Sequence, residues 1–222
     1  MISSRHQLAA RPAVPVDLGY LLYQPATPPE RGAGYPLLLF LHGMGDRGDD
    51  LDRVKQGGPP ARIEQGAELP FLVAAPQCPL GAVWQTDKLI ALVDELVARH
   101  PVDPTRIFVT GLSMGGAGTW ALANAYPQRF AAIAPVCGPF TMVDPVNFKS
   151  IPVWCFHGAM DTIVPLEHSL GMVRSLRNHG ADVRLTIYPD TEHDAWTQAY
   201  AGTELYDWLL TRGSQPKGAR GP

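Results

Sequence analysis

The sequence is poor in cysteine and has no regular cysteine spacing. Three cysteines occur among 222 residues, and none of them forms a Cys-x-x-Cys pair. An odd number without such spacing argues against both a disulfide framework and a zinc site. We therefore expect Cys78, Cys137 and Cys155 to be small buried apolar side chains, with a Cys137–Cys155 disulfide as the alternative.

Long apolar runs and concentrations of one charge are also missing. No stretch approaches the ~18 apolar residues of a membrane span. Lys and Arg total 18 against 21 Asp and Glu, for a net charge of −3, and the basic residues are scattered. Nucleic acid and membrane surfaces are therefore excluded as expected partners. The sequence does not indicate an oligomeric state.

The beginning of the chain lacks the uninterrupted apolar segment and the small-residue cleavage site of a signal peptide. We therefore expect a cytoplasmic protein, although earlier removal of a signal peptide would be compatible with secretion. No group of His, Cys, Asp and Glu has the spacing of metal ligands. Neither a metal nor an organic cofactor is expected.

Length and composition indicate one globular domain. Hydrophobic residues make up 45% of the chain and charged residues 18%, which is enough apolar material for a sizeable core. We assign residues 17–211 to the domain and residues 1–16 to an N-terminal lead. The tail, residues 212–222, is rich in Gly, Pro and Lys and is predicted to be disordered.

Short apolar runs alternate with helical patterns, which is typical of a mostly parallel sheet with helices on both faces. The predicted strands are residues 18–23, 36–41, 71–75, 106–110, 131–136, 152–156 and 183–188. The first of them follows a Pro-rich lead and is expected to be antiparallel and nearer the edge. Helical periodicity predicts helices over residues 87–100, 114–126, 166–179 and 195–210.

The sequence Gly-Leu-Ser-Met-Gly at residues 111–115 lies between a predicted strand and a predicted helix. In this context the Gly-x-Ser-x-Gly pattern indicates a nucleophile elbow, a tight turn that lifts a serine hydroxyl above the sheet. Glycines are needed two positions before and after the serine because side chains there would collide across the turn. Ser113 is therefore the candidate nucleophile.

The loop after the strand at residues 36–41 reads His-Gly-Met-Gly-Asp. In a fold with this elbow, that loop supplies one backbone N–H to an oxyanion, and the residue after the nucleophile supplies the other. The expected donors are the N–H groups of Met44 and Met114. His42 precedes the serine in the chain, and we expect it to hold the loop by hydrogen bonding.

Three histidines follow the candidate nucleophile at a plausible distance. His168 and His179 fall in a predicted helix, where a surface position or a C-terminal cap is expected. His193 lies in a loop between the last strand and the last helix, where a general base would enter from the carboxyl edge of the sheet. We assign the base to His193.

The acid that would orient the histidine has competitors. Asp161 follows the strand at residues 152–156 and is expected on the same rim as Ser113. Asp144 follows the preceding strand, where some enzymes with this elbow place their acid. Asp190 is interpreted as a turn residue. We assign the acid to Asp161 and keep Asp144 as the alternative.

Three motifs carry a family resemblance: LHGMGD at residues 41–46, GLSMGG at 111–116 and HGAMDTIVP at 157–165. They resemble the small carboxylesterase/phospholipase branch of the α/β-hydrolases. Residues 103–116 are also similar to feruloyl-esterase and polyhydroxybutyrate-depolymerase-like esterases. The resemblance covers about residues 36–209 and implies a single-domain α/β-hydrolase fold.

One position departs from that branch, which commonly has Gln after its nucleophile where Met114 stands. This departure argues against acyl-protein and lysophospholipid substrates. The connection at residues 137–151 is too short for a helical lid, so no cap or lid domain is expected. Trp84 and Trp196 are candidate pocket residues, with ordinary core or rim positions as the alternative.

The expected reaction is hydrolysis of short-chain, water-soluble carboxylic esters through a covalent acyl-enzyme, with a small-molecule ester as the partner. A small serine peptidase or a thioesterase using the same three residues stays open, because fold does not decide between these activities. A non-catalytic binding protein is disfavoured, since such proteins usually lose one of the three residues.

Overall fold

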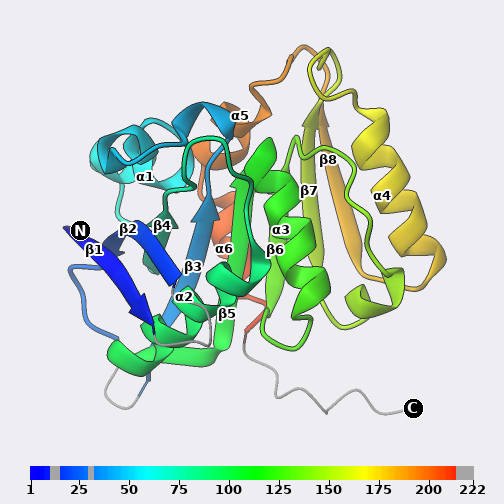
Figure 1. Ribbon diagram of the computed structural model, residues 1–222. Helices are drawn as coiled ribbons and strands as arrows, with labels where there is room; N and C mark the ends of the chain where they lie inside the picture. Colours follow the sequence, from blue (N-terminus) through cyan, green and yellow to red (C-terminus); the bar gives the residue numbers. More distant parts are fainter. Residues whose placement is uncertain (11–15, 30–32, 214–222) are drawn as a thin grey trace, which may run out of the picture.

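The computed structural model describes residues 1–10, 16–29 and 33–213, and its eight strands form one sheet (Figure 1). The strand order is β1-β2-β4-β3-β5-β6-β7-β8, and every pair from β4 to β8 is parallel. The strands are β1 (Ile2–Ala10), β2 (Val16–Gln24), β3 (Tyr35–Leu41), β4 (Leu72–Pro76), β5 (Val102–Leu112), β6 (Ala132–Val136), β7 (Val153–Gly158) and β8 (Val183–Tyr188).

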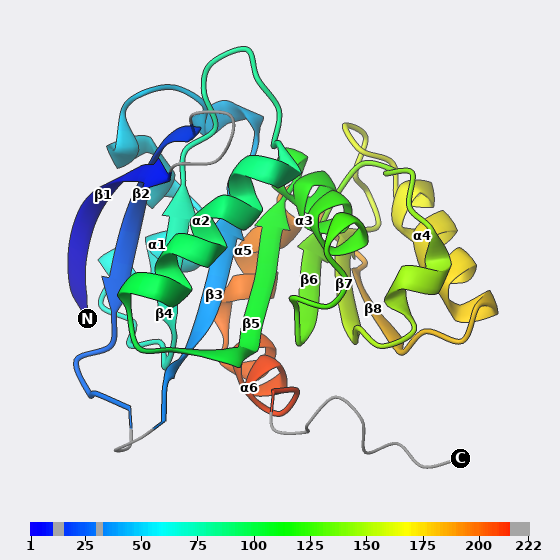
Figure 2. The same cartoon turned by 60° about the horizontal axis from the view of Figure 1, so that its bottom comes forward.

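Helices cover both faces of the sheet. Figures 1 and 2 show α2, α3 and α4 on one face and α1, α5 and α6 on the other. Strands such as β3 are therefore buried along their whole length and are apolar on both sides. The helices are α1 (Gly58–Glu64), α2 (Thr86–Arg99), α3 (Met114–Ala125), α4 (Glu167–Asn178), α5 (Ala195–Ala201) and α6 (Glu204–Leu210).

Two apolar cores follow from this arrangement, one on each side of the sheet. The core on the α2, α3 and α4 side includes Leu92, Trp120 and Leu176. The other core includes Tyr200 and Leu209. Each strand of the central sheet directs alternate side chains into the two cores. The sheet is therefore fixed on both faces, and the loops at the ends of its strands start from fixed positions.

All seven predicted strands are confirmed, with shifts of a few residues at their ends. The predicted antiparallel character of residues 18–23 is confirmed too, because β2 pairs antiparallel with β4. The edge position, however, belongs to β1, which pairs antiparallel with β2 and which we did not predict. Its sequence has no clear alternation of apolar and polar residues, so no local pattern indicated this strand.

One predicted helix was wrong in its extent. Residues 195–210 form two helices, α5 and α6, separated at Gly202 and Thr203. Gly202 is in an extended conformation, which ends the helical run. Helix α1 and three short 3₁₀ segments of the described chain were not predicted: η1 (Met44–Asp46), η2 (Leu51–Gln56) and η3 (Pro145–Phe148). Most of the predicted tail, residues 214–222, lies outside the described residues.

No cap domain covers the carboxyl edge of the sheet within the described residues. The connection between β6 and β7 holds a single helical element, η3, of four residues. That is too short to form an amphipathic lid. The described residues therefore form a single-domain, mostly parallel α/β sheet with no cap domain at its carboxyl edge.

Candidate active site

Ser113 occupies a sharp turn between β5 and α3. Its φ of 53° lies in the left-handed region, which a residue with a Cβ adopts only when its surroundings force it. The Ser113 N–H donates to the carbonyl of Val136 at 2.9 Å, which ties the turn to β6. A Cβ on Gly115 would lie 1.9 Å from the carbonyl oxygen of Leu41, so only glycine permits this turn.

Three side chains from separate loops form a hydrogen-bonded chain. His193 Nε2 lies 2.9 Å from Ser113 Oγ, and His193 Nδ1 lies 2.7 Å from Asp161 Oδ2. A carboxylate oxygen can only accept, so Nδ1 carries the proton and Nε2 faces the serine hydroxyl as an acceptor. This is the geometry in which an imidazole can remove the hydroxyl proton.

The carboxylate of Asp161 is buried and well bonded. Its Oδ1 accepts the N–H groups of Ile163 and Val164 at 2.9 and 2.8 Å. Burial by itself would raise the pKa of Asp161, but the hydrogen bonds from His193, Val164 and Ile163 outweigh it and hold the pKa below its ordinary value. The group is therefore ionised and able to stabilise an imidazolium.

A second glycine brings the histidine loop close to the sheet. A Cβ on Gly158, the last residue of β7, would lie 2.1 Å from the carbonyl oxygen of Glu192 and 2.3 Å from that of Thr191. The N–H of Met160 donates to Thr191 at 2.9 Å. The loop that carries His193 thus packs directly on the end of β7, next to Asp161.

The two expected oxyanion donors begin helical segments and line the same pocket as Ser113. Met44 is the first residue of η1, and Met114 is the first residue of α3. The first N–H groups of a helix have no partner within that helix. Neither N–H group therefore has a partner within its own helical segment, and Met114 lies at the positive end of the α3 dipole.

His42 holds the loop before Met44, as the sequence analysis expected. Its Nδ1 lies 2.6 Å from the carbonyl of Gly43, and its Nε2 accepts the N–H of Cys78 at 3.0 Å. Burial lowers the pKa of His42 to about 4, against the opposing hydrogen bond to Gly43, so the ring stays neutral. The Trp84 indole N–H donates to the carbonyl of His42 at 3.2 Å and adds a second hydrogen bond that holds the same loop in place.

The competing candidates lie in structural positions. His168 accepts the N–H of Phe140, and His179 caps the end of α4. Asp144 accepts the N–H of Val146 and begins η3. Asp190 lies in a turn after β8, as expected. None of the four has a hydrogen bond or ion pair with Ser113 or His193 among the contacts of the described residues.

All three cysteines are free and buried, which confirms the expectation of small apolar side chains and removes the Cys137–Cys155 disulfide. Burial raises the pKa of the Cys137 thiol well above its ordinary value, so it stays protonated. Cys137 nevertheless has an unusual backbone, with a φ of 40°. It directly follows Val136, whose carbonyl anchors Ser113.

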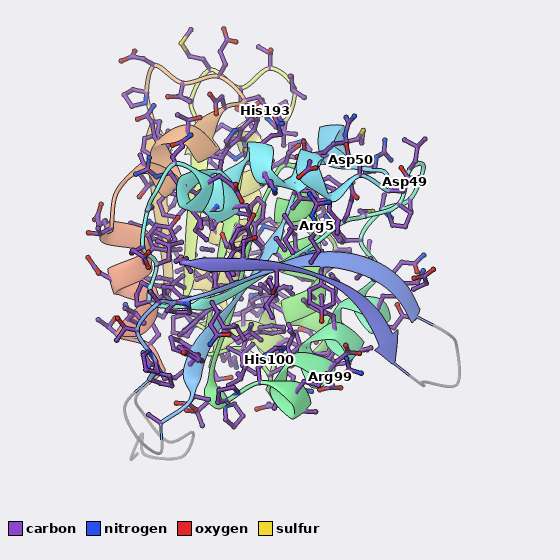
Figure 3. All side chains as sticks on the ribbon, turned by 90° about the vertical axis from the view of Figure 1, so that its left-hand side faces the viewer. Arg5, Asp49, Asp50, Arg99, His100 and His193 are labelled. Carbon is purple, nitrogen blue, oxygen red and sulfur yellow. The ribbon has the colours of Figure 1, made fainter. Side chains whose placement is uncertain are left out.

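Ser113 and His193 open into a pocket of about 800 Å³. Both tryptophans that the sequence suggested as pocket residues line it, and the rings of Trp196 and His193 are perpendicular with centroids 5.3 Å apart. The rest of the lining is mainly apolar and includes Met44, Val83, Ala121 and Ile163. Figure 3 shows His193 at the end of the molecule opposite Arg99 and His100.

Among the described residues, no three His, Cys, Asp or Glu side chains gather closely enough to hold a metal ion. No helix in residues 1–10, 16–29 and 33–213 has the length and hydropathy of a membrane span.

Two residues near the site had no assigned role in the sequence analysis. His157 and Ser169 are both buried and hydrogen-bonded to each other beneath Asp161. His157 was visible in the HGAMD motif, and its position four residues before Asp161 was the available signal. Ser169 gave no such signal in the sequence, because α4 brings it next to His157 only in the folded chain.

An open α/β sheet with a serine at the elbow after β5 and an aspartate–histidine pair on the adjoining loops defines the α/β-hydrolase class. The sequence model of the phospholipase/carboxylesterase family matches residues 83–203. This protein belongs to that family. The match spans more than half of the chain and includes Ser113, Asp161 and His193.

Individual relatives agree with this assignment. Carboxylesterase SOBER1 of Arabidopsis thaliana is 27% identical over 188 residues, which cover 70% of this chain and 82% of the relative. A bifunctional acetylxylan esterase/xylanase of Neocallimastix patriciarum is 25% identical over 185 residues, 78% of this chain. The chain spans only 26% of that larger protein.

Solved structures share the fold. A thermostable esterase superimposes with a TM-score of 0.80 at 30% identity, over 95% of this chain and 63% of the esterase. An acetyl xylan esterase from Aspergillus awamori has a TM-score of 0.71 at 15% identity, over 92% of this chain and 99% of that one. At that identity the second likeness bears on the fold alone.

Proposed function

We propose that this protein is a serine carboxylesterase that hydrolyses short-chain, water-soluble esters through a covalent acyl-enzyme. The observation that carries the proposal is the hydrogen-bonded chain from Ser113 through His193 to Asp161, at 2.9 and 2.7 Å. Membership of the phospholipase/carboxylesterase family supports the same reaction.

Each residue has a defined task in the proposed reaction. Ser113 Oγ attacks the ester carbonyl while His193 Nε2 takes its proton, and the N–H groups of Met44 and Met114 stabilise the oxyanion. His193 then protonates the leaving alcohol, which departs and leaves Ser113 acylated. Water, activated by His193, repeats the sequence and releases the acid.

A fluorophosphonate probe tests the nucleophile directly. We expect the wild-type protein to be labelled on a single serine, Ser113, because this hydroxyl lies beside a general base and two expected oxyanion donors. Labelling is read by intact-mass spectrometry followed by peptide mapping. The Ser113→Ala variant is the control and should remain unmodified. Labelling of that variant to the wild-type extent would reject Ser113 as the nucleophile.

The preference for short esters is supported by the open site. In the part of the chain that the structure describes, no helix covers the pocket, so a long acyl chain would leave much of its length in water and a lipid surface would find no helical lid to open. A pocket of about 800 Å³ is in the range that holds a whole small ligand, so it can receive both the acyl and the alcohol part of a small ester.

We expect kcat/KM for p-nitrophenyl esters to rise with acyl length and then stop increasing at about four to six carbons. Each methylene that finds apolar surface adds ~0.8 kcal/mol, and the gain ends where the pocket ends. Rates are measured from acetate to palmitate, below and above the micelle concentration, with thioester and anilide analogues in the same panel. A maximum at twelve carbons or beyond, or a jump in rate at the interface, contradicts the expectation.

A further inference from the structure

A buried histidine that the proposed reaction does not use lies directly beneath the proposed acid. His157 is on β7 and is 0% exposed, and both of its ring nitrogens have partners. Buried polar side chains are expensive to leave unbonded. The hydrogen bonds of this imidazole therefore fix the orientation of the ring relative to the groups around it.

The partners determine the tautomer of His157. Nε2 lies 2.8 Å from the carbonyl oxygen of Val164, which can only accept, so Nε2 carries a proton. Nδ1 lies 2.7 Å from Ser169 Oγ. In a neutral ring Nδ1 is an acceptor, so the Ser169 hydroxyl donates to it. The Cys155 thiol in turn donates to Ser169 Oγ at 3.3 Å and completes the ordering of that hydroxyl.

The same N–H edge faces the proposed acid. His157 Nε2 lies 3.3 Å from Asp161 Oδ2, the oxygen that accepts the Nδ1–H of His193. Val164 is bonded from both sides: its carbonyl accepts from His157, and its N–H donates to Asp161 Oδ1. His157 therefore ties the turn that carries Asp161 to β7 by a hydrogen bond. The partial positive charge of its Nε2–H group also faces the carboxylate.

We propose that His157, held in one tautomer by Ser169, is a positioning residue that keeps the Asp161 carboxylate aimed at His193. This inference rests on the proposed function, because it assigns His157 a role through the proposed acid. It adds a second histidine and a helix α4 serine to the network behind the nucleophile. His157 itself touches no reacting atom.

The charges around His157 are compatible with this role. Among the described residues, the titratable groups that act on His157 are Asp161 on the adjoining turn and His193 on the loop after β8, and Cys155 lies on its own strand beyond Ser169. Burial lowers the pKa of His157, although the Val164 carbonyl and Asp161 oppose this, and the ring is neutral. Burial raises the pKa of Cys155 to about 11, so the thiol is neutral as well.

The test replaces the ring with an apolar side chain and with an amide. We expect His157→Leu to lower kcat by about 10- to 100-fold with little change in KM, because a displaced carboxylate misorients the base rather than the substrate. The acid limb of the pH profile of kcat/KM should move to lower pH, since an imidazolium without a well-placed carboxylate loses its proton more readily. His157→Gln keeps one donor and one acceptor and should restore most of kcat.

Two further variants separate positioning from simple stability. Ser169→Ala leaves Nδ1 without its donor and should lower kcat several-fold, with the same direction of pH shift; this variant carries the test if His157→Leu does not fold. Thr186→Val is the matched control on the neighbouring strand, because it removes the acceptor of the Trp154 indole N–H, 2.9 Å away and outside the site. It should lower Tm without moving the pH profile.

An acid limb that stays in place or moves to higher pH in His157→Leu overturns the inference, and the same result in Ser169→Ala overturns it where His157→Leu does not fold. So does a failure of His157→Gln to recover activity while it retains the wild-type Tm. Failure of the proposed function looks different: Ser113→Ala would then keep its activity or its label. If Ser113→Ala is inactive and the His157 variants behave as wild type, only the positioning role is lost.

Discussion

Ser113→Ala and His193→Ala are each expected to lower kcat by at least about 10³-fold, because residues that act as one unit lose nearly the whole of its contribution when either is removed. Ser113→Ala deletes a single oxygen and leaves the Cβ at the elbow, so the packing of the turn against Gly115 and Leu41 should not change. His193→Ala removes a partly exposed ring from a loop that Gly158 and Met160 continue to hold against β7.

The measurement is steady-state hydrolysis of p-nitrophenyl acetate by purified variants, together with circular dichroism and Tm to establish that the fold is kept. A matched control is His179→Ala, whose exposed ring bonds the Ser175 carbonyl at the end of α4. It should retain activity within about twofold, as expected of a surface position. Retention of more than about a tenth of wild-type activity by folded Ser113→Ala or His193→Ala would falsify the assignment.

The second large effect concerns the acid. Asp161→Asn is expected to lower kcat by up to about 10⁴-fold, the size seen when an Asp→Asn change in a serine-protease triad favours the wrong imidazole tautomer. An amide at this position can turn its NH₂ group toward His193 Nδ1, which then becomes the acceptor and puts the proton on Nε2. The imidazole would then be unable to take the proton of Ser113.

Asp144→Asn is the matched control, because it makes the same chemical change at the alternative acid. Asp144 begins η3 and accepts the N–H of Val146, and asparagine is about as good an N-cap as aspartate. We expect kcat within about twofold of wild type. If Asp144→Asn lowers kcat more than Asp161→Asn does, Asp161 is not the acid and Asp144 takes that role.

Local patterns along the chain were sufficient for most of the sheet. The strand at β3 is apolar at nearly every position, as burial on both faces requires, and residues 183–188 match β8 without a shift. The elbow was also readable, because a tight strand–turn–helix imposes glycine at positions 111 and 115 whatever the rest of the chain does. These features depend on sterics and solvation within about ten residues, and such short-range constraints are visible in a sequence.

Elements without a local pattern were missed. β1 pairs with β2 at the edge of the sheet, and an edge strand needs no strict apolar alternation. The break between α5 and α6 lies at a single glycine, Gly202, within a stretch of helical periodicity. One glycine does not interrupt that periodicity, so the sequence pattern did not indicate the break. The first depends on a strand elsewhere in the chain, and the second on the extended backbone that Gly202 adopts.

The sequence by itself determined the class of fold and the succession of most strands and helices along the chain. It also determined the residue types at the site: Ser113 at an elbow, Asp161 after β7 and His193 after β8. Only the tertiary structure decided which donors and acceptors meet, that Asp161 rather than Asp144 bonds His193, and that His157 and Ser169 stand behind it. The reason is physical. Residues 32 and 80 positions apart come within hydrogen-bond distance only when parallel strands end at a common edge, and distances across that edge have no counterpart along the chain.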